Sequence, residues 1–218
     1  MNPTAVDLED TATAVELMDS YAQSVVDGKI KASRLVVLAC QRHRRDRLND
    51  ELHFDGDLVQ HWLDFMRGLP HVVGEAAERG ELFEPLPWQV FCIGSLLGWH
   101  WADGRRRYRL GLIEVARGNG KTTLLAGVAL WAQLHGSGRE VYLFANTQRQ
   151  AKKCYRTAMF MARGIAPEEL PHARGEKRRW RDREFTLTTD TIADQENRNV
   201  LMAIPAKENS LDGLDPFC

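Results

Sequence analysis

"LIEVARGNGKTTLLAGVALWAQL", residues 112–134, contains the strongest motif in the chain. Gly120-Lys121-Thr122 stands between apolar residues that predict a strand and apolar residues that predict a helix. This strand–loop–helix order is the context of a phosphate-binding loop, because the backbone N–H groups and the dipole at a helix N-terminus attract an anion. The usual G-x-x-x-x-G-K-[ST] pattern has glycine where this chain has Val115, so the motif departs from the pattern there.

The loop residues have the chemistry that a nucleoside triphosphate requires. Lys121 is expected to reach the β- and γ-phosphates, and the Thr122 hydroxyl to hold Mg²⁺. Gly118 and Gly120 can take positive φ and let the backbone approach the phosphates closely. An ordinary strand-to-helix turn is the alternative. The predicted nucleotide-binding residues of the loop are Arg117, Gly118, Asn119, Gly120, Lys121, Thr122 and Thr123.

Arg117 adds a guanidinium at the entrance of the loop. A cation there is suited to stabilise charge on the γ-phosphate oxygens, as arginine fingers do. The alternative is that Arg117 pairs with a carboxylate such as Glu114. Lys121 and Arg117 are therefore the candidate catalytic residues.

Composition limits the remaining possibilities. The chain has 218 residues, 44% hydrophobic and 27% charged, which is enough for one domain with an appended subdomain. No apolar run reaches the roughly 18 residues of a membrane helix, and the acidic N-terminus does not resemble a signal peptide. A cytosolic protein without a membrane partner is expected. The 4 cysteines are widely spaced, so the sequence indicates neither a zinc site nor a disulfide framework.

The texture of the chain changes near residue 80. Apolar residues at helical spacing predict an N-terminal helical lead-in over residues 1–80, and 81–218 alternate between strand and helix patterns. Such alternation predicts an α/β fold, a mostly parallel sheet flanked by helices as in P-loop NTPases. The predicted strands are 107–115, 139–147, 184–190 and 200–206, and the predicted helices of this part are 122–134 and 148–162.

Basic residues are clustered although the net charge is −1. The clusters are QRHRRDR (41–47), GRRRYR (104–109) and ARGEKRRWRDR (173–183). Each is either a solvated surface or a contact for a phosphate backbone. The third is predicted to lie in an exposed loop, and its Arg178, Arg179 and Arg181 are the candidate DNA contacts.

Four motifs resemble the large terminase subunits of tailed bacteriophages: FEPLPWQVFCIGSLLGW (83–99), IEVARGNGKTTLLAGVAL (113–130), VYLFANTQRQA (141–151) and SLDGLDP (210–216). In that family the first glycine of the loop is absent and a basic residue lies near its start, so Val115 is a match. The resemblance implies that Gln89, in the P-W-Q motif, contacts adenine. The alternative is that Trp88 and Gln89 begin a helix with Pro87 in its first turn.

The resemblance also implies a function. Large terminase subunits are ATP-driven motors that thread double-stranded DNA through the portal protein into the procapsid, and they carry a nuclease domain. ATP and Mg²⁺ are the implied cofactors, the portal and the small terminase subunit are the implied partners, and a homo-oligomeric ring is expected. The implied location is the host cytoplasm, transiently at the procapsid portal and not in the finished virion.

The sequence stops at Cys218, shortly after the L-D-G-L segment. In the family, the acidic Walker B strand and then the nuclease follow this segment. The fold is therefore expected to be incomplete at its C-terminus, and the chain to bind ATP but hardly hydrolyse it. Two alternatives remain open, a helicase-like P-loop motor and a non-catalytic module that binds a partner or DNA.

Overall fold

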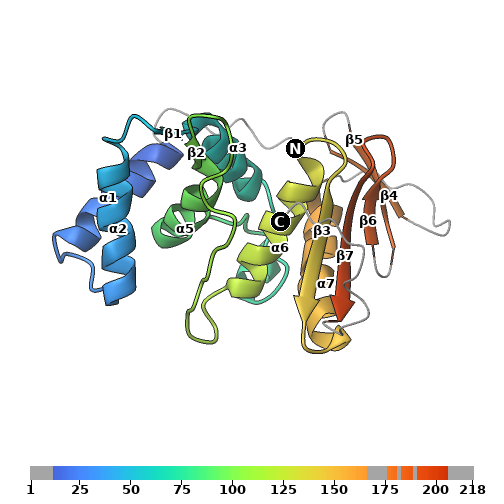
Figure 1. Ribbon diagram of the computed structural model, residues 1–218. Coiled ribbons are helices and arrows are strands. Elements are labelled where there is room, and N and C mark those ends of the chain that lie inside the picture. The colour runs from blue at the N-terminus through green and yellow to red at the C-terminus, as the bar shows by residue number, and fades with distance from the viewer. Residues whose placement is uncertain (1–11, 166–175, 181–182, 189–190, 206–218) are drawn as a thin grey trace. The chain divides into compact units, whose positions relative to one another are not determined.

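The computed structural model describes residues 12–165, 176–180, 183–188 and 191–205 (Figure 1). The chain divides into two compact units. Unit 1 comprises residues 1–63 and 86–113, and unit 2 comprises residues 64–85 and 114–218. The chain therefore passes from unit 1 to unit 2 twice, and this division does not coincide with the predicted boundary at residue 80. In the described part of the chain, no helix combines the length and the apolarity needed to cross a bilayer.

Unit 1 consists of helices and one short two-stranded sheet. Its elements are α1 (Ala14–Val26), α2 (Arg34–Asp46), β1 (Leu52–Phe54), the first part of α3 (Gly56–Arg67), α5 (Pro87–Gly98) and β2 (Trp99–Trp101). The strands β1 and β2 pair antiparallel. The predicted helical character of the N-terminal region is confirmed.

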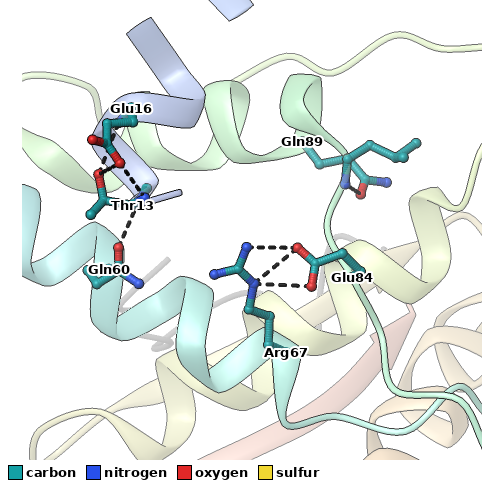
Figure 2. A network of polar contacts seen from close by, with 8 residues as sticks. Thr13, Glu16, Gln60, Arg67, Glu84 and Gln89 are labelled. Atoms are coloured by element: carbon teal, nitrogen blue, oxygen red, sulfur yellow. Dashed lines mark hydrogen bonds and ion pairs between the residues drawn. The ribbon is translucent and has the colours of Figure 1, made fainter. Parts of the chain in front are cut away.

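The first helix is fixed by its cap and by a close approach to α5. Thr13 Oγ1 accepts a hydrogen bond from Glu16 N at 3.2 Å, and Glu16 Oε2 accepts one from Thr13 N at 2.8 Å, which is a capping box (Figure 2). On α5, a Cβ at Gly94 would overlap the side chain of Met18. Glycine at this position lets α1 and α5 pack closely.

The core of unit 1 contains a buried histidine. His43, on α2, is 3% exposed, and its Nε2 lies 2.8 Å from Asp19 Oδ1. Its Nδ1 accepts a hydrogen bond from Trp99 Nε1 at 3.2 Å. Because an indole N–H can only donate, the imidazole is neutral with its proton on Nε2. Burial lowers the pKa of His43, Arg47 lowers it further, and Asp19 and Asp46 oppose the shift.

Unit 2 is the α/β part of the chain. Its elements are the end of α3, α4 (Glu75–Glu78), α6 (Lys121–Leu134), β3 (Glu140–Ala145), α7 (Gln148–Ile165), β4 (Glu176–Trp180), β5 (Arg183–Leu187), β6 (Thr191–Asp194) and β7 (Asn199–Pro205). The strands form one sheet in the order β3-β7-β6-β5-β4. Helices α6 and α7 pack against each other and against β3 and β7 (Figure 1).

The predicted α/β class is confirmed, and so are the predicted helices at α6 and α7 and the predicted strands at β3, β5 and β7. The sheet is mixed, however, and not mostly parallel. Only β3 and β7 pair parallel among the described strands, whereas β7, β6, β5 and β4 pair antiparallel. The physical reason is the short connections along β4–β7, because a parallel crossover requires a dozen or more residues.

Two further predictions were wrong. Residues 107–115 form no strand. Arg107 N donates to Trp99 O of β2 at 2.9 Å, but no ladder with a described strand continues from there, and Leu110 and Leu112 are 88% and 89% exposed. Residues 176–180, predicted as part of a loop, form the edge strand β4. The apolar pattern of 107–115 and the basic composition of 176–180 thus did not predict which of the two segments forms a strand.

We expect unit 1 to lose stability in acid because of His43. Its folded pKa lies below the ordinary value of 6.5, so below about pH 6.5 the unfolded chain binds a proton that the folded chain excludes. The free energy of unfolding should therefore fall as the pH drops from 6.5 toward the folded pKa, and His43→Gln should flatten this dependence. Urea titrations at several pH values measure it. The exposed His53 supplies the control, and an equal flattening by His53→Gln would contradict the assignment.

Candidate functional site

The candidate site is the turn that precedes α6. Gly118 and Gly120 have φ values of 92° and 69°, as expected from the motif. Gly120 is the N-cap of α6 and provides no side-chain hydrogen bond, and the first helical turn contains no acidic residue. The first N–H groups of a helix have no intrahelical acceptor. Because neither a side-chain cap nor an acidic residue lies in the first turn, no local side chain neutralises the positive end of the α6 dipole. This is the arrangement of an anion-binding helix terminus.

Lys121 turns back onto its own loop. Its Nζ donates to Val115 O at 2.6 Å and to Ala116 O at 2.8 Å. Asn119 Nδ2 also donates to Ala116 O, at 3.1 Å. Val115, which stands where the usual motif has glycine, thus contributes its backbone carbonyl group. Any residue type could supply this group. These carbonyl acceptors could not be predicted from side-chain identities.

The guanidinium of Arg117 lies on an exposed part of the loop. No ion pair joins it to Glu114 within the described residues, so the structure gives no support to the pairing that the sequence left open. Arg117 is therefore accessible to an anion at the loop entrance.

The first turn of α6 is anchored to α7 through a thiol. Cys154 Sγ lies 3.7 Å from Thr122 O and donates its weak S–H to this carbonyl. Burial raises the pKa of Cys154 to about 11, so the residue is a protonated packing group and not a reactive thiolate. The hydroxyl-bearing side chains of Thr122 and Thr123 are partly exposed. Sequence patterns gave no indication of this contact, which joins residues 32 positions apart on two helices.

Gln89 belongs to unit 1, whereas residues 117–123 belong to unit 2. Gln89 is 3% exposed, and its Oε1 accepts a hydrogen bond from Leu86 N at 2.8 Å (Figure 2). Pro87 is the first residue of α5, so the helix start that was the alternative interpretation of the P-W-Q motif is present. A helix-capping contact uses only the carbonyl oxygen, so the amide nitrogen keeps its capacity to donate.

The candidate DNA contacts are only partly within the described residues. Arg178 and Arg179 lie in β4, at the edge of the sheet, and Arg181 lies outside the described residues.

The loop fits a triphosphate by its chemistry. An ammonium, a guanidinium and uncapped backbone N–H groups are all donors, as phosphate oxygens require. A magnesium ion at such a loop is held largely by phosphates, waters and one hydroxyl, and Thr122 supplies a hydroxyl. Among the described residues there is no group of three or more His, Cys, Asp or Glu side chains arranged for a metal.

The fold and the loop define an ATPase domain of the P-loop type. Comparison with protein families gives a match to the terminase large subunit, ATPase domain, over residues 87–217, which is more than half of the chain. The chain belongs to this family. No curated protein and no solved structure gives a significant match.

We expect the loop to need the positive φ of Gly118. A side chain at this position should cost as much stability as at another open glycine with positive φ. Gly118→Ala should lower the free energy of unfolding by about 1–2 kcal/mol, because a Cβ disfavours this backbone conformation. Gly138, in the turn before β3, has φ 66° and equally open surroundings, so Gly138→Ala should cost a similar amount. Urea unfolding of the two variants makes the comparison. A Gly118→Ala variant as stable as the parent chain would show that the loop does not hold this conformation.

Proposed function

We propose that the chain is the ATP-binding part of a viral DNA-packaging motor that couples ATP hydrolysis to translocation of double-stranded DNA into a procapsid. Its membership of the terminase ATPase family supports a packaging ATPase. The observation that carries the site assignment is the Lys121 ammonium, held over the loop at the uncapped N-terminus of α6.

The loop residues bind the phosphates. Lys121 exchanges the carbonyls of Val115 and Ala116 for phosphate oxygens, and the first N–H groups of α6 donate to the same anion. The Thr122 hydroxyl contributes to Mg²⁺ binding. Arg117 stabilises charge on the terminal phosphate from the exposed entrance of the loop.

Gln89 selects adenine in this proposal. Its carbonyl oxygen is engaged by Leu86 N–H, which fixes the side chain at the start of α5. The amide nitrogen is the group that donates to an adenine acceptor. Capping and base recognition use different atoms of one carboxamide and are compatible.

ATP hydrolysis makes a demand on the site that ATP binding does not. Hydrolysis requires a carboxylate to orient the attacking water, which commonly contributes about 10²–10⁴-fold in rate. Among the described strands of the sheet, β6 ends in a carboxylate, Asp194. Asp194 accepts hydrogen bonds from Asn197 N and Nδ2 at 3.0 and 2.8 Å, so it serves the β6–β7 turn.

The partners and the location follow from the same proposal. Double-stranded DNA is the substrate, the portal protein and the small terminase subunit are partners, and the full motor acts as a homo-oligomeric ring. The protein acts in the host cytoplasm at the procapsid portal. Family membership favours packaging over the helicase-like alternative.

Replacement of the loop lysine tests nucleotide binding. Lys121→Ala should weaken ATP–Mg²⁺ binding by about 1.5–3 kcal/mol, because it removes a charge-assisted hydrogen bond. Isothermal titration calorimetry measures the affinity, and Lys153→Ala, on the exposed surface of α7, is the charge control. Gly118→Ala should also weaken binding, whereas Gly138→Ala should not. Equal affinity of the Lys121→Ala variant and the parent chain would exclude the loop as the phosphate site.

Base selection is tested at Gln89. Gln89→Ala should reduce the preference for ATP over GTP and also destabilise α5 by about 0.5–2 kcal/mol through loss of the cap. Gln89→Glu keeps an oxygen for Leu86 N–H but loses the amide donor, so it should retain the helix and still lose the preference. Competition between the two nucleotides measures the effect. If Gln89→Glu discriminates as the parent does, the residue is only a helix cap.

DNA contact is tested at the third basic cluster. Combined replacement of Arg178, Arg179 and Arg181 by glutamine should flatten the dependence of DNA affinity on salt by about one unit of slope for each lost phosphate contact. Fluorescence anisotropy with labelled duplex DNA at several salt concentrations measures the slope. Combined replacement of Arg149, Lys153 and Arg156 by glutamine, at exposed positions of α7, removes the same number of charges and controls for net charge. An unchanged slope in the triple variant would assign DNA binding elsewhere.

A further inference from the structure

Unit 1 contains a cavity that the proposed ATPase function does not use. It lies between α2, α5 and the segment 108–113, and its volume is about 190 Å³. Ala39 and Arg42 line it from α2, Cys92 and Leu96 from α5, and Trp99 at its inner side. Binding sites for cofactors and drug-sized molecules measure about 300–1,000 Å³, so this cavity is too small for a nucleotide. Its size fits a single large side chain.

Exposed leucines surround the cavity on two elements. On the segment 108–113, Leu110 and Leu112 are 88% and 89% exposed and also line the cavity. On α2, Leu35 and Leu38 are 77% and 48% exposed. Leu35 precedes Ala39 by four residues and Arg42 by seven, and Leu38 precedes Arg42 by four. The two leucines thus share the helix face of Ala39 and Arg42. A cluster of exposed apolar side chains around a cavity is typical of an interaction surface.

The same rim carries positive charge. Arg42 is exposed, with its guanidinium carbon 5.0 Å from the centre of the Tyr108 ring, and Arg109 is exposed next to Leu110. The single carboxylate between α2 and this segment, Asp46, is buried and bound to Arg107 at 2.5 Å. Its charge is therefore already neutralised. The fold has brought the basic clusters 41–47 and 104–109 together into one surface.

The mixture of leucines and arginines decides between two kinds of partner. A nucleic acid backbone would neutralise the arginines but leave the leucines in water. A protein segment with acidic and apolar residues would cover both, and an anchor side chain in a pocket is the usual centre of such an interface. We propose that the α2–α5 cavity docks an acidic protein segment that inserts one large apolar side chain.

This interaction is separate from ATP binding and is tested without nucleotide. Peptides are selected from a phage-displayed random library on the immobilised chain, and the best are synthesised with a fluorescent label. We expect the selected peptides to carry a large apolar residue flanked by Asp or Glu. Anisotropy titrations then compare the parent chain with Leu112→Ser and Arg42→Ala, each of which should weaken binding about tenfold or more.

Matched controls come from α2 and from the turn that follows it. Leu48 is 87% exposed, close to the 89% of Leu112, and Arg44 is exposed on the opposite flank of α2 from Arg42. Neither lines the cavity. Leu48→Ser and Arg44→Ala should therefore bind the peptides as the parent chain does, and circular dichroism verifies that all four variants are folded.

Three results would overturn the proposal. The first is that selection yields no peptide, or peptides without an acidic and apolar signature. The second is that Leu112→Ser and Arg42→Ala bind the peptides as tightly as the two controls. The third is that labelled duplex DNA binds this surface, with affinity lost in Arg42→Ala and kept in Leu112→Ser, which would make the surface a nucleic acid contact.

Discussion

The hydrogen bonds from Lys121 to the carbonyls of Val115 and Ala116 set the character of the loop. They close the turn before any anion is bound, with Gly118 and Gly120 in the left-handed backbone region that makes the turn possible. In the proposed nucleotide site, a phosphate would replace these carbonyl groups as the acceptor of the Lys121 ammonium. The net gain in binding free energy is the difference between a hydrogen bond to a neutral carbonyl and one to a charged phosphate. The loss of ATP affinity expected in Lys121→Ala is therefore moderate.

Elements held by interactions between residues close in sequence could be predicted, and those held by interactions between distant residues could not. Helix α6 and strand β3 were predicted because their patterns, and the glycines between them, are local. The antiparallel pairing among β4, β5, β6 and β7 was not predicted, since it depends on which strands become neighbours in the folded sheet. The segment 107–115 shows this most clearly, because its apolar alternation predicts a strand, yet no described strand pairs with it.

The candidate site was predictable to the same degree. The motif identified Lys121 and the glycines, because backbone conformation and charge are encoded at each position. It did not identify the carbonyl acceptors, which carry no side-chain signature, or Cys154, which reaches Thr122 from the next helix. The α2–α5 cavity was also beyond prediction. It forms between segments far apart in the sequence, and a buried ion pair, Asp46 with Arg107, joins α2 to the residues just before 108–113.

Gly111, which lies between the exposed Leu110 and Leu112, packs closely against α5. A Cβ at this position would lie 2.7 Å from Leu96 Cδ1, so a larger residue would require the partly exposed Leu96 side chain to move. Leu110 and Leu112 line the same cavity as Leu96 and are exposed at its rim. A shift of one residue along the chain would place a leucine against Leu96 in place of Gly111. An apolar protein segment docked at this cavity would remove both leucines from water.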